Sequence, residues 1–237
     1  MRVLAIDTAL EACSAAVFDT IRGETVRGDA ARGGVTASES LAMTRGHAEA
    51  IMPLIARVMD QAEIEFGELD RIAVTTGPGS FTGIRVGISA ARGIALAAGK
   101  PAIGLSTLSG FAAPHIAADD TQPVVAVIDA RHEQVYLQMF GMGGRTLVVP
   151  RIASLREALR IAAKGPCRVV GSAAAALAAA WPKHEPPPAL VEQRGAPEIG
   201  WVARLGAAAA EGYGPPKPLY LRAPDAQPQD AARLPRR

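Results

Sequence analysis

Apolar runs and helical spacing divide the first half of the chain into strands and helices. Short apolar runs predict strands at 3–8, 13–18, 71–75 and 102–105, with a further strand around 25–29. Apolar positions three and four residues apart predict helices at 44–61, 80–98 and 107–116. Strands first, followed by strand and helix in alternation, favour a mixed α/β sheet with helices packed on it.

The second half also reads as strands and helices, with shorter predicted elements. Strands or extended segments are expected at 124–140, 147–149 and 168–170, and helices at 154–163, 172–180 and 198–211. Pro182 and the prolines at 186–188 interrupt the chain between the last two helices. The tail 223–237 is rich in Pro, Asp, Gln and Arg without an apolar period, which predicts a disordered tail.

Two segments repeat one another. The apolar runs 3–8 and 125–130 contain Asp7 and Asp129, and each is followed by a short polar turn and a second strand. The two aspartates lie 122 residues apart. This repeat predicts a duplicated fold, with a first lobe at 1–106 and a second lobe at 107–222.

A glycine-bearing turn, Thr-Gly-Pro-Gly-Ser-Phe-Thr-Gly at 76–83, joins the predicted strand 71–75 to the next helix. The free N–H groups and partial positive charge of a helix N-terminus suit an anion. Seven residues are candidates for an anion site there: Asp7, Thr8, Gly77, Gly79, Ser80, Thr82 and Arg85. Equally, the glycines can serve backbone geometry alone, and Asp7 with Thr8 can close a β-turn. The segment lacks the lysine of a Walker A loop and the Gly-x-Ser-x-Gly spacing of a nucleophile elbow.

The two helices beside this turn carry two different stripes. The first stripe is apolar and consists of Ile51, Leu54, Ile55 and Val58. The second recurs every fourth residue and consists of the small residues Gly83, Gly87, Ala91 and Ala95, flanked by Ile84 and Ile88. A small-residue stripe lets another backbone approach closely. Its neighbour is either the chain's own sheet or a partner helix.

Composition narrows the class of protein. The chain has 237 residues, of which 49% are hydrophobic, enough for one large core or two lobes. A net charge of +2 is too small for the chain to hold a nucleic acid backbone by itself. Cys13 and Cys167 form neither a zinc motif nor a disulfide framework. The N-terminal apolar run is too short for a signal peptide, and no later run reaches about 18 uninterrupted apolar residues, so we expect a cytoplasmic protein.

Four motifs together resemble one family. They are Asp7-Thr8, Gly-His-Ala-Glu at 46–49, the glycine motif with Ile-Arg-Val-Gly at 76–87, and Tyr220-Leu221-Arg222. The sequence resembles TsaB (YeaZ), a subunit of the bacterial machinery that makes threonylcarbamoyladenosine in tRNA. The resemblance implies an actin-like ATPase (ASKHA) fold of two duplicated lobes. It also implies a non-catalytic subunit that works with TsaD and TsaE to transfer threonylcarbamoyl from its adenylate to N6 of adenosine 37.

The resemblance further implies how the chain assembles. TsaB-like proteins pair with TsaD through helices of the first lobe, so both stripes are expected to face the partner: Ile51, Leu54, Ile55, Val58, Gly83, Ile84, Gly87, Ile88, Ala91 and Ala95. The sequence does not decide whether the isolated chain forms a homodimer. Contact with tRNA is expected only through the complex, and Tyr220 and Arg222 are expected to pin the C-terminus onto the first lobe.

The chemistry expected of the chain is limited. TsaD uses a His-x-x-x-His pair for a metal ion, whereas no two of His47, His115, His132 and His184 lie three to five residues apart. No catalytic residue, metal or cofactor of its own is expected. The sequence does not decide whether a nucleotide binds weakly, either to the chain or at the complex interface. The alternatives are an ATP-binding kinase or ATPase of the same superfamily, using Asp7, and a metallopeptidase, for which no nucleophile or metal dyad can be assembled.

Overall fold

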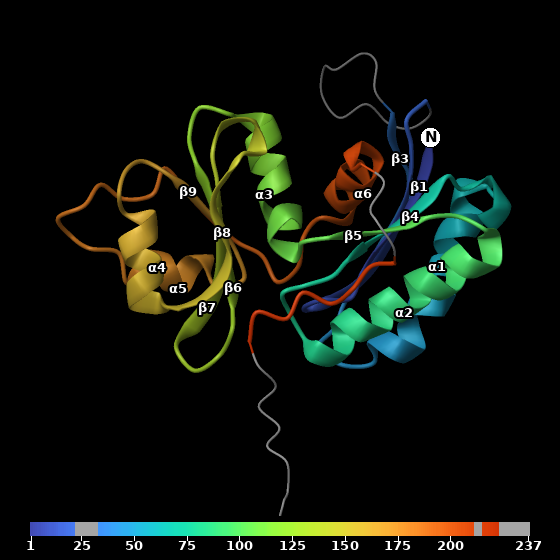
Figure 1. Cartoon of the computed structure of the whole chain (residues 1–237), viewed down its shortest axis with the longest axis horizontal. Coiled ribbons are helices and arrows are strands. Elements are labelled where there is room, and N and C mark those ends of the chain that lie inside the picture. The colour runs from blue at the N-terminus through green and yellow to red at the C-terminus, as the bar shows by residue number, and fades with distance from the viewer. Residues whose placement is uncertain (22–32, 211–214, 223–237) are drawn as a thin grey trace, which may run out of the picture.

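The first lobe is built on a five-stranded mixed sheet. The computed structural model describes residues 1–21, 33–210 and 215–222 (Figure 1). The strand order is β3-β2-β1-β4-β5, in which β1 pairs antiparallel with β2 and parallel with β4. The strands are β1 (Arg2–Asp7), β2 (Ala12–Asp19), β3 (Gly34–Ala42), β4 (Arg71–Thr75) and β5 (Ala102–Leu105).

The second sheet repeats the first. Its order is β8-β7-β6-β9-β10, with the same antiparallel pairs followed by the same parallel pairs. The strands are β6 (Val124–Asp129), β7 (Gln134–Phe140), β8 (Thr146–Ser154), β9 (Arg168–Gly171) and β10 (Leu190–Gln193). Asp7 ends β1 and Asp129 ends β6. The duplication predicted from these two aspartates is therefore confirmed.

Helices cover both faces of each sheet (Figure 1). The described helices are α1 (His47–Ala62), α2 (Phe81–Ala98), α3 (Thr107–Ala118), α4 (Leu155–Ala162), α5 (Ala174–Ala179) and α6 (Ile199–Ala208), with short 3-10 turns at Phe66–Glu68 and Met142–Gly144. α1 and α2 pack on the outer face of the first sheet, and α4 and α5 on the outer face of the second. α3 and α6 lie between the sheets, so the molecule has five layers.

Each of the two inner helices packs on the sheet of the other half of the sequence. α3 follows the first sheet in sequence but packs on β6 of the second, whereas α6 follows the second sheet and packs on β1, β2 and β4 of the first. The apolar residues Ile199, Val202 and Ala203 of α6 are buried against Val3 and Ala73. Burial of its apolar face therefore packs α6, which lies within the expected second lobe 107–222, on the sheet of the first lobe.

Most predicted elements occur within a few residues of their expected bounds, but two strands were missed. β3 and β10 are edge strands with many exposed residues, so neither shows the apolar run by which the other strands were recognised. The strand expected around 25–29, the end of the last helix at 211 and the tail 223–237 lie outside the described residues.

Candidate functional site

The glycine turn packs directly on the turn that follows β1. Ser80 N–H donates a 2.7 Å hydrogen bond to the carbonyl oxygen of Ala9, and Thr8 Oγ1 donates one of 2.6 Å to the carbonyl oxygen of Gly83. A Cβ atom on Gly79 would clash with Ala9 O, and one on Gly83 with Thr8 O. Glycine is needed at both positions because the chain's own backbone fills the space in front of them.

The N-terminus of α2 is capped from within. Ser80 has an extended backbone, and its Oγ accepts a 3.3 Å hydrogen bond from Gly83 N–H, as an N-cap residue does. Gly77 has φ = 107°, a conformation that side chains rarely adopt, and Thr82 is exposed. Of the two hydroxyl residues at this helix start, Ser80 is the N-cap.

Asp7 is buried beneath this turn. Its Oδ1 accepts hydrogen bonds from Thr75 Oγ1 and, at 3.2 Å, from Ala9 N–H, while Oδ2 has no partner among the described residues. Burial raises the pKa of Asp7 to about 6, against the lowering effect of these hydrogen bonds. Its counterpart Asp129 is exposed and accepts a 2.8 Å hydrogen bond from Arg131 N–H. The two aspartates share a position in the repeat but not an environment.

Both predicted stripes face the interior of the first lobe. Gly83 and Gly87 contact Thr8 and Val74, so the small stripe rests on the turn after β1 and on β4. The expectation that the stripes contact a partner is corrected, because all ten side chains or backbones are buried in this chain: Ile51, Leu54, Ile55, Val58, Gly83, Ile84, Gly87, Ile88, Ala91 and Ala95. Close helix–sheet packing explains the spacing of four.

The opposite side of the same two helices is exposed and apolar. An open groove of about 470 Å³ lies between α1 and α2, lined by Ala48, Ile51, Met52, Phe81, Thr82, Arg85, Val86, Ser89 and Ala90. We call these residues the α1–α2 groove. Met52 is 47% exposed and Phe81 49%, which is high for side chains of this size. The predicted stripes contributed only Ile51 to it. Met52 and Phe81, the large apolar residues lying off those stripes, were the signal that could have located it.

The C-terminal segment 215–222 crosses from one lobe to the other beside this groove. The Tyr220 ring stacks on Phe81 at 5.3 Å between centroids, and Arg85 Nε donates a 2.8 Å hydrogen bond to the Tyr220 hydroxyl. Arg222 instead binds the second lobe, donating hydrogen bonds to the carbonyl oxygen of Ala130 (2.8 Å) and to Gln134. Tyr220 thus pins the segment to the first lobe as expected, whereas the expectation for Arg222 was wrong.

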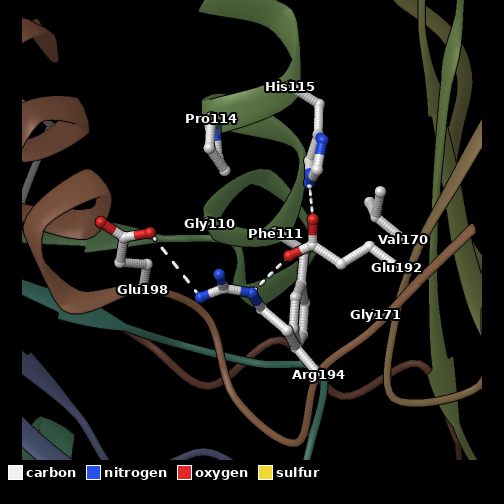
Figure 2. Close-up of a pocket in the computed structure, with 9 residues that line it drawn as sticks. All are labelled: Gly110, Phe111, Pro114, His115, Val170, Gly171, Glu192, Arg194 and Glu198. Atoms are coloured by element: carbon white, nitrogen blue, oxygen red, sulfur yellow. Dashed lines mark hydrogen bonds and ion pairs between the residues drawn. The ribbon is translucent and has the colours of Figure 1, made fainter. Parts of the chain in front are cut away.

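A small enclosed pocket lies between the lobes (Figure 2). His115 of α3 points at Glu192, which also pairs with Arg194, and Arg194 reaches Glu198 at 3.6 Å before α6. Burial lowers the pKa of His115. The cavity volume of about 10 Å³ holds about one water molecule. The pocket is therefore a charged contact between the lobes, too small for a substrate.

Two further features bear on the class of protein. Among residues 1–21, 33–210 and 215–222, no three His, Cys, Asp or Glu side chains are grouped as metal ligands. α2 has the length and apolar content of a membrane span, but Ile84, Ile88 and Ile94 are buried in the first lobe. This burial is typical of a core helix.

Comparison with known proteins identifies the family. The family profile described as TsaD, tRNA N6-adenosine threonylcarbamoyltransferase, matches residues 26–192. The tRNA threonylcarbamoyladenosine biosynthesis protein TsaB of Escherichia coli is 38% identical over 136 residues, which cover 57% of this chain and 53% of that protein. The match thus spans about half the length of this curated relative.

Other relatives match along nearly the whole chain. An uncharacterised protein of Mycobacterium tuberculosis is 32% identical over 232 residues, covering 95% of this chain and 94% of that protein. A solved Pseudomonas aeruginosa structure, described as similar to peptidase YEAZ, superposes with a TM-score of 0.75 at 27% identity, covering 93% of this chain and 99% of that one. With the duplicated mixed sheets, this superposition confirms the expected two-lobed α/β fold. The chain belongs to the TsaB (YeaZ) family, within the wider group of TsaD-like proteins.

Proposed function

We propose that this chain is a non-catalytic dimerisation and scaffold subunit of a tRNA-modifying complex. With a TsaD-like transferase and a TsaE-like ATPase, it is required for transfer of threonylcarbamoyl from threonylcarbamoyl-AMP to N6 of adenosine 37 in tRNA. Family membership supports this role, and the exposed α1–α2 groove is the observation that carries it. The chain acts in the cytoplasm and binds no cofactor of its own.

The α1–α2 groove is the docking face for the TsaD-like subunit. Half-exposed apolar and aromatic side chains around a groove are typical of protein interfaces, where aromatic residues and arginine act as anchors. Met52 supplies a flexible apolar surface, and Phe81 is held in place by Arg85, whose guanidinium lies 3.7 Å from the ring centroid. When the partner is absent, a second copy of this chain covers the same face, forming a homodimer.

The surroundings of Asp7 support a non-catalytic role. A catalytic carboxylate must reach its substrate or a water molecule held beside it, but Asp7 is fully buried and Thr8 and Ala9 bond to the start of α2. An ATP-dependent kinase or ATPase, the alternative function, requires this turn to open. Turnover of ATP by the isolated chain that is lost in Asp7→Asn would favour that alternative.

Reconstitution of the reaction tests the proposal. Unmodified tRNA, threonylcarbamoyl-AMP and the TsaD-like and TsaE-like proteins of the same organism are incubated with and without this chain, and modified adenosine is quantified by mass spectrometry. We expect multiple turnover only when the chain is present, and equal support from the Asp7→Asn variant. Full modification without the chain, or loss of support in Asp7→Asn, would count against a non-catalytic subunit.

A further inference from the structure

Positive charge is concentrated in one segment of the second lobe. Residues 145–168 carry six basic residues and one acidic residue, a net charge of +5, in a chain whose net charge is +2. The rest of the chain therefore has a net charge of −3. Such an asymmetry within one chain indicates a surface that meets a polyanion.

Three of these cations form a row, which we call the basic row. Arg156 and Arg160 lie on α4, Lys164 follows in the turn after it, and all three are exposed. Residues four apart on a helix lie on the same face, about 5–6 Å from one another. The opposite face of α4 buries Ala158 and Ala162, and Leu155 and Leu159 beside it pack against the same core, which directs the row to solvent.

The basic row has no counter-charge of its own. None of its three residues forms an ion pair with any residue that the structure describes. Glu157, the one acidic residue of the segment, instead pairs with Arg151 at 3.3 Å. Arg151 therefore neutralises the carboxylate beside the row, and the three cations have no ion pair within the described part of the chain.

The row is not arranged for the stability of the helix. Like charges four residues apart repel one another, and Arg156 lies in the first turn, where the helix dipole is positive. Arg160, in the last turn, and Lys164, just after it, lie at the negative end of the dipole, which favours cations. A partner with regularly spaced negative charges would offset the repulsion at all three positions.

We propose that the basic row binds the phosphate backbone of RNA. α4 lies on the outer face of the second sheet, whereas α1 and α2 lie on the outer face of the first, so partner and RNA can be bound together (Figure 1). Contacts to phosphate orient the RNA without reading its sequence. That the RNA is the tRNA substrate rests on the proposed function. The proposal differs from the expectation that the chain meets tRNA only through its partners.

The test measures binding of an unmodified tRNA transcript to the complex of this chain with its TsaD-like partner, by fluorescence anisotropy at several salt concentrations. The variant is the triple substitution Arg156→Gln, Arg160→Gln and Lys164→Gln. A matched control replaces Arg45, Lys100 and Lys217 by Gln; these lie outside the row and have no ion pair among the described residues. Both variants lose three positive charges.

We expect the row variant to bind tRNA at least about 10-fold more weakly near 0.1 M salt. The slope of log affinity against log salt should become shallower by about 2, since each phosphate contact contributes about 0.7–0.9. The control should retain the wild-type slope. Equal slopes for wild type and row variant, or equal losses in row variant and control, would overturn the proposal.

Light scattering of each complex separates this inference from the proposed function. If the row variant pairs normally and binds tRNA as well as wild type, only the RNA-binding row is wrong. If the wild-type chain forms no complex with the TsaD-like protein, or if that complex binds no tRNA, the proposed function and this inference fail together.

Discussion

Thr8 and Gly83, 75 residues apart in sequence, are joined by a 2.6 Å hydrogen bond from the Thr8 hydroxyl to the Gly83 carbonyl oxygen. The bond ties the turn after β1 to the first turn of α2. It is possible because position 83 has no side chain, since a Cβ there would clash with the carbonyl oxygen of Thr8. Small residues in α2 therefore serve the fold of the first lobe.

Gly83→Ala and Gly93→Ala should have opposite effects on stability, although both place alanine in α2. Gly83→Ala should lower the free energy of unfolding by about 2–3 kcal/mol through overpacking against Thr8. At Gly93 nothing lies within 4 Å of the added Cβ, so Gly93→Ala should raise it by roughly 0.5–1 kcal/mol. Urea unfolding checks both. Equal shifts of the urea midpoint in Gly83→Ala and Gly93→Ala would show that Gly83 is not in tight contact with the turn after β1.

The same geometry predicts the result for Gly87. Its Cβ would approach Thr8 Oγ1 and Val74, so Gly87→Leu should destabilise the lobe itself and not only remove a partner contact. The buried stripe therefore cannot be used to test pairing, and variants of exposed residues are needed for that purpose.

Asp7 should make the stability of the protein depend on pH. The carboxyl ionises near 3.8 when unfolded and near 6 when folded, so the folded state binds the proton more tightly. The free energy of unfolding should therefore fall as pH rises from about 4 to about 6, by roughly 3 kcal/mol in all. Asp7→Asn has no carboxyl group to ionise and should lack this fall. The measurement is urea unfolding of both proteins from pH 4 to 8.

The decisive quantity is how the difference in free energy of unfolding between wild type and Asp7→Asn changes with pH. The asparagine amide replaces Oδ2, for which the described residues supply no partner, and carries its own cost, which does not vary with pH. Parallel curves for wild type and Asp7→Asn would contradict a pKa near 6 and a carboxyl group buried away from water.

Arg222→Ala should loosen the segment that joins the two lobes. The substitution removes the hydrogen bonds to Ala130 and Gln134, and the amide of Leu219, which donates a 2.8 Å hydrogen bond to Thr76, should then exchange its hydrogen at least about 10-fold faster. Hydrogen exchange followed by mass spectrometry detects this change. Lys217→Ala, an exposed position in the same segment, serves as control and should leave exchange unchanged.

The sequence predicted the sheets and most helices because their signals are local. Apolar runs marked the central strands, and the repeat around Asp7 and Asp129 marked the duplication. Two long-range facts escaped prediction. Small residues at every fourth position of α2 indicate that another backbone element packs closely against the helix. They do not identify that element, because a sheet and a partner helix require the same small residues. Nor does local sequence reveal that Arg222 reaches Ala130, 92 residues away.

Pairing of a groove variant with the TsaD-like subunit decides whether the α1–α2 groove is the docking face. Met52→Asp with Val86→Asp places two charges in the groove, while Val149→Asp places one on an exposed strand of the second lobe. Isothermal titration calorimetry against the TsaD-like protein should give wild-type affinity for Val149→Asp and at least about 100-fold weaker binding, a loss of about 2.7 kcal/mol, for the groove variant. Wild-type affinity of a correctly folded groove variant would contradict the claim.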